Sequence, residues 1–300
     1  MSPDLPGFSP PVLPPFPLRA RRLVDGVHLG SHRSRIRGEG AEFAEYRPYR
    51  QGDPLRNVDW RVYARTDRLY VRLREQEVSR RVSIVIDDSR SMDFGSPETK
   101  LQRAALAAAT LALLCERTGD SYGIDALHSG SSLPCRRGPA HRIAIMKTLE
   151  YLGSSKSANA ADELALAGAV ERRNRDGRGG RLLILCSDFL CSLDDLARAL
   201  RNWSGRGGDL IACHFIDRAE LDLDGHGMMR YRDPETGDEM DTRPDEIRDE
   251  YLRALYLHID RVRRIIQERG GDHRLIRSTE DLRGVLIELQ RRRARARASA

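Results

Sequence analysis

Residues 82–91 read Val-Ser-Ile-Val-Ile-Asp-Asp-Ser-Arg-Ser, a short β-branched apolar run that ends in small oxygen-bearing side chains. Runs of this length and composition are typical of strands that are buried on both faces of a parallel sheet. In open α/β sheets, ligands bind just beyond the carboxyl ends of the strands. The sequence therefore predicts a functional site at Asp87, Ser89 and Ser91, directly after this strand.

The three predicted site residues carry oxygen donors at alternate positions of a loop. Asp87 offers a carboxylate, while Ser89 and Ser91 offer hydroxyls. These hard ligands suit Mg²⁺ or Mn²⁺ better than softer metals. A structural alternative remains open for Asp87, because an acid at the end of a strand often accepts hydrogen bonds from the backbone of a neighbouring loop.

A second buried run, residues 181–186, also ends at an acid. It is followed by Ser187, Asp188 and Phe189. Because the carboxyl ends of parallel strands meet at one edge of the sheet, Asp188 is expected near Asp87. Asp188 is therefore the fourth predicted metal ligand.

Strand and helix patterns alternate along the chain, which predicts a doubly wound, mainly parallel α/β sheet. A hairpin is expected at residues 231–242. The predicted strands cover residues 69–73, 82–86, 122–127, 181–186, 209–216 and 274–277, and the predicted helices cover residues 18–27, 101–116, 142–152, 161–172, 193–203 and 244–269.

Residues 38–77 pack Arg, Asp, Glu, Trp and Tyr unusually densely into irregular sequence. One interpretation is a hydrogen-bond and ion-pair network that holds a β-rich lobe against the main sheet. The other is a recognition surface for a partner, and both can hold together. The residues assigned to this network or surface are Arg47, Asp53, Asp59, Trp60, Arg65 and Arg72.

These patterns divide the 300-residue chain into four segments. Residues 1–32 form a proline-rich, basic segment with a short helix, and residues 33–80 form the β-rich N-terminal elaboration. Residues 81–290 form the α/β domain, and residues 291–300 form a basic tail.

Composition excludes some classes of protein. The chain is 40% hydrophobic and 32% charged, and no apolar run is long enough to span a membrane. The N-terminus lacks the pattern of a secretory signal. The chain has five cysteines, which are odd in number and scattered along the sequence. Cys115, Cys186 and Cys213 lie inside apolar runs, which is typical of buried thiols in a reducing compartment. We therefore expect a cytoplasmic protein.

The motifs resemble two related families. Asp87-x-Ser89-x-Ser91, with Asp188 after a later strand, resembles the metal-ion-dependent adhesion site of von Willebrand factor type A domains. The upstream segment is similar to the signature of the bacterial "domain of unknown function 58" family, on the motifs Gly38-x-Gly40-x-Glu42-Phe43, Arg47-x-Tyr49-x-x-Gly52-Asp53, Asp59-Trp60, Ala64-Arg65-Thr66 and Val71-Arg72.

This resemblance implies a von Willebrand type A fold with an N-terminal elaboration and a non-enzymatic role in protein interaction. Genes of this family commonly neighbour those of MoxR-type AAA+ ATPases, which implies a partnership in assembly or maturation of protein complexes. The chain departs from the pattern at one point. The adhesion site uses a threonine between the two acidic strands, whereas residues 154–162 contain none. Ser157, Asn159, Asp162 or water could replace it.

The sequence leaves two other classes of function as alternatives. A metal-dependent phosphoryl-transfer enzyme would use a strand-end aspartate, but haloacid-dehalogenase-like phosphatases place a second Asp where this chain has Ser89, and no glycine-rich phosphate loop is present. The arginines at residues 291–297 could bind nucleic acid, but no nucleic-acid module accompanies them. The sequence therefore favours an interaction module over an enzyme or a nucleic-acid binder.

Overall fold

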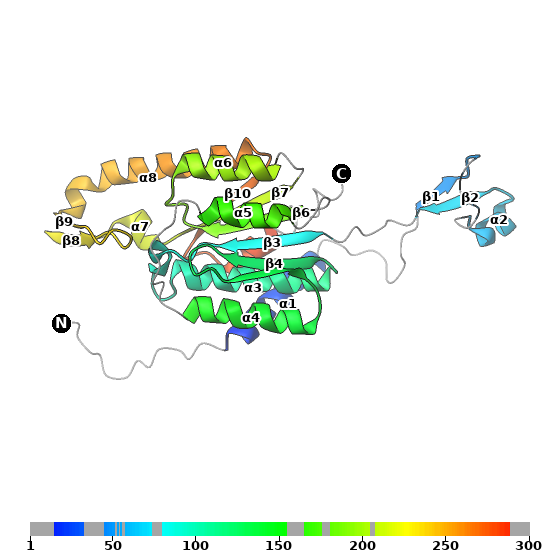
Figure 1. The fold of residues 1–300 in the computed structure, drawn as a ribbon, viewed down its shortest axis with the longest axis horizontal. Coiled ribbons are helices and arrows are strands. Elements are labelled where there is room, and N and C mark those ends of the chain that lie inside the picture. The colour runs from blue at the N-terminus through cyan, green and yellow to red at the C-terminus, as the bar shows by residue number, and fades with distance from the viewer. Residues whose placement is uncertain are drawn as a thin grey trace. The chain divides into compact units, whose positions relative to one another are not determined.

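The computed structural model describes residues 15–32, 45–51, 53, 55, 58–73, 80–154, 165–175, 181–204 and 208–288 of the chain. The described residues fall into two compact units (Figure 1). The smaller unit lies within His32–Val78, and the larger unit comprises the residues of Met1–Ser31 and Ser79–Ala300.

The larger unit is built on a six-stranded sheet with the strand order β10-β7-β6-β3-β4-β5. All neighbouring pairs are parallel except β4 and β5, which are antiparallel. This topology confirms the predicted doubly wound, mainly parallel sheet. The strands are β3 (Arg81–Ile86), β4 (Ser121–Ala126), β5 (Ser132–Arg136), β6 (Arg181–Ser187), β7 (Asp209–Ile216) and β10 (Asp272–Arg277).

Helices cover both faces of this sheet (Figure 1). One apolar cluster joins one face to α1 (Phe16–His32), α3 (Lys100–Arg117) and α4 (Pro139–Ser154). A second cluster joins the other face to α5 (Ala165–Arg175), α6 (Leu193–Ser204) and α8 (Pro244–Gln267). The short elements are η2 (Arg90–Asp93), α7 (Arg218–Asp222), β8 (Met229–Arg232) and β9 (Glu239–Thr242).

The central strand β3 is buried on both faces because its side chains alternate between the two clusters. Val82, Ile84 and Ile86 lie in the first cluster, and Val85 lies in the second. The apolar run in the sequence therefore predicts correctly that this strand is central. Within the strand Ser83 is the one buried polar side chain, and the run of acidic and hydroxyl side chains begins where β3 ends, at Asp87.

Helix α3 begins at a fixed point beside the strand ends. Thr99 accepts a hydrogen bond from the backbone of Gln102, and the Gln102 side chain accepts one from the backbone of Thr99. This reciprocal capping box satisfies two helix-end N–H groups. It also places Lys100, the first residue of α3, in the interior.

Strand β5 was not predicted from the sequence. It is an edge strand with alternating burial, and it contains Pro134, which is tolerated at an edge and weakens the strand pattern. The buried side chain of Arg173, from α5, secures this edge. Its guanidinium donates to the backbone oxygens of Ile124 on β4, at 2.6 Å, and Leu133 on β5, at 2.8 Å, and pairs with the carboxylate of Asp125.

The smaller unit contains strand and helix. Strands β1 (Glu45–Pro48) and β2 (Tyr70–Leu73) pair antiparallel, and α2 (Trp60–Thr66) lies between them in sequence. The sequence predicted β2 but not α2. The helix has a local cause, because the Asp59 carboxylate accepts hydrogen bonds from the N–H groups of Arg61 and Val62 and so caps its first turn.

Among the described residues, no helix is both long enough and apolar enough to cross a membrane. The buried positions of Cys115, Cys186 and Cys213 agree with the sequence analysis.

The Arg173–Asp125 pair gives a stability prediction. Arg173→Met should lower the free energy of unfolding by about 3 kcal/mol or more, because it leaves the fully buried Asp125 carboxylate without its main counterion. Arg175→Met is the control, since Arg175 is exposed and pairs only across the surface with Glu171, so its loss should cost about 0.5 kcal/mol or less. Urea denaturation of both variants measures the difference, and equal stabilities would contradict the role of Arg173.

Candidate functional site

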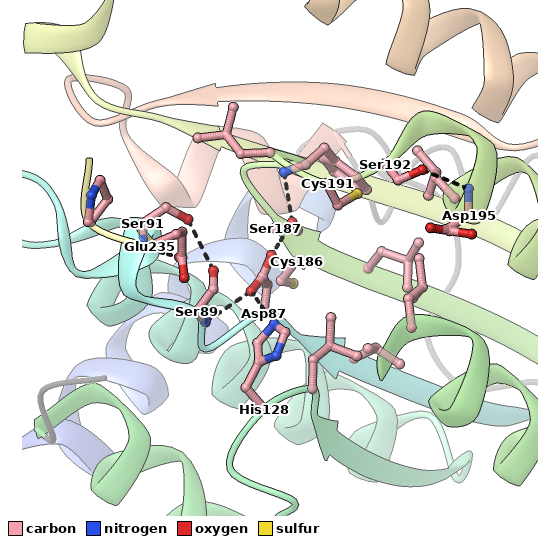
Figure 2. Close-up of a pocket in the computed structure, with 18 of the residues that line it drawn as sticks. Asp87, Ser89, Ser91, His128, Cys186, Ser187, Cys191, Ser192, Asp195 and Glu235 are labelled. Carbon is pink, nitrogen blue, oxygen red and sulfur yellow. Dashed lines mark hydrogen bonds and ion pairs between the residues drawn. The ribbon is translucent and has the colours of Figure 1, made fainter. Parts of the chain in front are cut away.

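A pocket of about 490 Å³ opens at the carboxyl edge of the sheet, beyond β3 and β6. Its lining is mixed (Figure 2). Asp87, Ser89, Ser91 and His128 lie on one side, and Cys191, Ser192 and Asp195 lie on the other. The apolar lining comprises Val85, Leu127, Leu166, Leu185, Phe189, Leu190 and Leu196.

Asp87 lines this pocket and is held in place by three hydrogen-bonding groups. Its Oδ1 accepts from the Ser89 N–H at 3.0 Å, and its Oδ2 accepts from the Ser187 hydroxyl at 2.5 Å. The His128 Nε2 atom lies 3.3 Å from Oδ1. His128 is placed there by Asp88, whose carboxylate accepts from the N–H groups of His128 and Ser129.

These contacts keep Asp87 ionised. Burial by itself would raise the pKa of Asp87, but hydrogen bonds from His128, Ser187 and Ser89 outweigh that effect and lower it below its usual value. Burial would likewise lower the pKa of His128, but its hydrogen bond to Asp87 and the negative charge of that group raise it. The pocket therefore presents a carboxylate that is charged at neutral pH.

Ser89 and Ser91 complete the predicted loop. Their hydroxyl oxygens are 3.1 Å apart, and both residues are buried. The N–H of Ser91 donates to Oε1 of Glu235 at 2.8 Å, so a second carboxylate reaches this loop from the turn between β8 and β9 (Figure 2). The structure therefore brings together Asp87, Ser89 and Ser91, as the sequence predicted.

Asp188 has a different environment. It follows β6 at the same edge of the sheet, but its Oδ2 accepts from Lys100 Nζ at 2.8 Å, and Lys100 also donates to Glu220 at 2.6 Å. Lys100 and Asp188 are only 2% and 4% exposed. Burial alone would lower the pKa of Lys100, but the charges and hydrogen bonds of the two acids raise it. Asp188 thus already has a cationic partner.

The donor set fits a hard cation in part. Asp87, Ser89 and Ser91 supply a carboxylate and two hydroxyls, whereas the role of Asp188 as a ligand stays a prediction because the Lys100 ammonium competes for it. Within the described ranges, no group of three or more His, Cys, Asp or Glu side chains is arranged to hold a metal. The candidate replacements for the missing threonine, residues 157, 159 and 162, lie outside the described residues. An ion here would take its remaining ligands from water or from a partner.

The contacts around Asp87 do not form a hydrolase triad. In such a triad, histidine lies between the nucleophile and the acid and takes the proton from the serine. Here Asp87 lies between Ser187 and His128, and the Ser187 hydroxyl donates to the carboxylate. This order does not activate Ser187 as a nucleophile.

The predicted network residues of the smaller unit have local structural roles where they are described. Asp59 caps α2, and Asp53 accepts from the N–H of Arg50 at 2.9 Å within a turn. Trp60 is 57% exposed and Arg65 is also exposed. Arg47 lies on β1 and Arg72 lies on β2. The side chains of these two residues are not among those that the structure describes. The assignment of these residues to a partner surface stays a prediction.

Four site residues were not identified from the sequence, namely Lys100, His128, Ser187 and Glu235. Ser187 adjoins Asp188 after a buried strand, so its position gave a signal. His128 follows β4, but it is placed by a contact from Asp88, which is 40 positions away in sequence. Lys100 and Glu235 reach their partners across 88 and 144 positions, and no local pattern encodes such contacts.

Comparison with known proteins adds a family match. A family model described as "Protein of unknown function DUF58" matches residues 45–261. The chain is 29% identical over 269 residues to "Uncharacterized protein Rv1480" of Mycobacterium tuberculosis, which covers 88% of this chain and 83% of the relative. "Uncharacterized protein Mb1516" of Mycobacterium bovis matches to the same extent.

Two solved structures show a weaker likeness. BatB, a conserved hypothetical protein from Bacteroides thetaiotaomicron, has a TM-score of 0.47 at 16% identity, covering 72% of this chain and 100% of that chain. The SpRpn10 VWA domain has a TM-score of 0.38 at 14% identity, covering 70% of this chain and 94% of that domain. The strand order and the family match, rather than these values, identify the fold.

The buried Lys100 gives a second stability prediction. Lys100→Met should destabilise the protein by about 3 kcal/mol or more, because Asp188 and Glu220 then lose their shared buried cation. Lys147→Met is the matched control, since Lys147 is exposed on α4 and its substitution should change stability by about 0.5 kcal/mol or less.

Thermal and urea unfolding of the two variants check this prediction. Equal stabilities of the Lys100→Met and Lys147→Met proteins would show that the ion pairs of Lys100 do not stabilise the fold.

Proposed function

Because the chain belongs to the DUF58 family of proteins of unknown function, we propose that it is a non-enzymatic protein-interaction module whose binding site is the pocket around Asp87. The observation that carries this proposal is the convergence of Asp87, Ser89 and Ser91 in the lining of that pocket. Open α/β sheets bind their ligands at this edge. The order of the contacts around Asp87 supports binding rather than catalysis.

We propose further that the loop binds Mg²⁺ or Mn²⁺, with water in the remaining ligand positions until a partner docks. Asp87, with its lowered pKa, would supply a charged oxygen, and Ser89 and Ser91 would supply neutral ones. These three ligands leave a divalent ion short of the six that Mg²⁺ prefers. A carboxylate from a partner would complete the shell, so that metal and partner would bind together.

The proposed partner is a MoxR-type AAA+ ATPase, acting with this chain in the assembly or maturation of protein complexes. This part of the proposal comes from the family resemblance. An acidic side chain on the ATPase, or on the complex that it remodels, would be the contact that the Asp87 loop binds.

Metal binding is tested on the full chain by calorimetric titration with Mn²⁺. We expect one site, and Asp87→Asn should weaken binding by tenfold or more, which is about 1.4 kcal/mol, because it removes the charged ligand. Ser89→Ala with Ser91→Ala should also weaken binding without altering the charge of the pocket. Asp195→Asn is the control, because it removes a different carboxylate from the lining of the same pocket. An unaltered Mn²⁺ affinity in the Asp87 and serine variants would rule out this site.

The partnership is tested with the purified MoxR-type ATPase from the same genome. Retention of the ATPase by immobilised chain should require Mg²⁺, and it should be lost with chelator and in the Asp87→Asn variant. Equal retention under all these conditions would place the contact elsewhere, with the exposed Trp60 of the smaller unit as the next surface to test.

A further inference from the structure

The β8–β9 hairpin of this chain brings its own acid to the proposed binding loop. Asp233, Pro234 and Glu235, at the turn of the hairpin, line the same pocket as Asp87. The turn is internally fixed, because Asp233 Oδ1 accepts from the N–H groups of Glu235, at 2.7 Å, and Thr236, at 3.2 Å. Glu235 is therefore presented in a defined position.

Glu235 contacts the loop through both its side chain and its backbone. Its Oε1 accepts from the Ser91 N–H at 2.8 Å, between two residues that Figure 2 shows side by side. Its carbonyl oxygen accepts from Arg90 Nη1 at 3.4 Å. A backbone N–H beside two buried hydroxyls thus already binds a carboxylate. The position suits an acid, because a hydrogen bond to an ionised group is stronger than one between neutral groups.

We propose that Glu235 is an internal stand-in for the partner's acidic side chain, and that the partner is an acidic segment that also carries a large apolar residue. The partner's carboxylate replaces Glu235 at the Ser91 N–H, and its apolar side chain enters the pocket. This inference rests on the proposed function, since it concerns the same site, and it defines the chemistry of the partner.

The apolar part of the pocket explains how a partner can compete with a tethered acid. Leu127, Leu185, Phe189 and Leu196 line it, and a volume of about 490 Å³ remains open with the hairpin in place. That volume is within the range of ligand-binding pockets. The turn contributes Pro234 but no large apolar side chain. A partner with Leu or Phe near its acid gains apolar burial that the hairpin does not have.

Displacement of the hairpin leaves the main sheet intact. Strands β8 and β9 pair with each other in a separate two-stranded sheet and take no part in the six-stranded sheet. An isolated hairpin of this size is only marginally stable by itself. Movement of Glu235 out of the pocket therefore breaks its contacts with Arg90 and Ser91 without breaking a ladder of the core.

The contact is tested by hydrogen exchange on the full chain. In Glu235→Gln, which weakens a charge-assisted hydrogen bond, amide exchange at residues 89–92 should become about tenfold faster. Glu239→Gln is the matched control, because Glu239 is an exposed acid of the same hairpin that pairs with Arg230. Unchanged exchange at residues 89–92 in Glu235→Gln would overturn the proposal.

Partner chemistry is tested with an array of synthetic peptides that carry one Glu and one Leu at different spacings. Glu235→Gln should retain such peptides about tenfold more than wild type or Glu239→Gln, because the tethered competitor is weakened. Replacement of the peptide's Glu by Gln, or of its Leu by Ser, should abolish retention. Equal retention by all three proteins, or none by any, would overturn the proposal.

The array is run with Mg²⁺ and with chelator. If the Glu235→Gln protein still retains the peptides in chelator, the result supports the role of Glu235 as an internal competitor for the partner's acid. The same result rejects a metal-dependent site. Retention that requires Mg²⁺ but is equal in wild type and Glu235→Gln would support the metal site and reject the role of Glu235. The two proposals can therefore fail separately.

Discussion

The burial of β3 on both faces is the constraint on which the site depends. From Val82 to Ile86 the strand lies between two apolar clusters and is buried throughout, so the cluster of acidic and hydroxyl side chains comes only where it ends. Because β6 is its parallel neighbour and obeys the same rule, Ser187 and Asp188 come at the same edge as Asp87. The hydrogen bond from Ser187 to Asp87 is the direct consequence of this register.

Buried charge then decides what each acid at this edge can do. A carboxylate removed from water needs a counterion or several hydrogen bonds. Asp188 is paired with the Lys100 ammonium, which the capped start of α3 places in the interior. Asp87 instead receives hydrogen bonds and faces the pocket. Of these two strand-end acids, Asp188 is already paired with a buried cation, whereas Asp87 lines the pocket.

Much of the fold and half of the site follow from local sequence. The central strands are encoded by short apolar runs, and the oxygen-bearing loop by its position after one of them. The edge strand β5 was missed because Pro134 weakens its pattern, and α2 because its capping Asp59 lies in a segment crowded with other charges. The pairing of Asp188 with Lys100 and the contact of Glu235 with Ser91 depend on tertiary approach, which no local pattern specifies.

The loop after β3 presents two kinds of group side by side. Its carboxylate and hydroxyl oxygens are suited to a cation, whereas its Ser91 N–H is suited to an anion and already binds one. A partner carboxylate at the N–H would lie next to a cation on the oxygens, and each would favour the other electrostatically. The Ser91 N–H already donates to an acid at this loop, the carboxylate of Glu235. In the proposed site the metal would add affinity and selectivity for the acid that replaces Glu235.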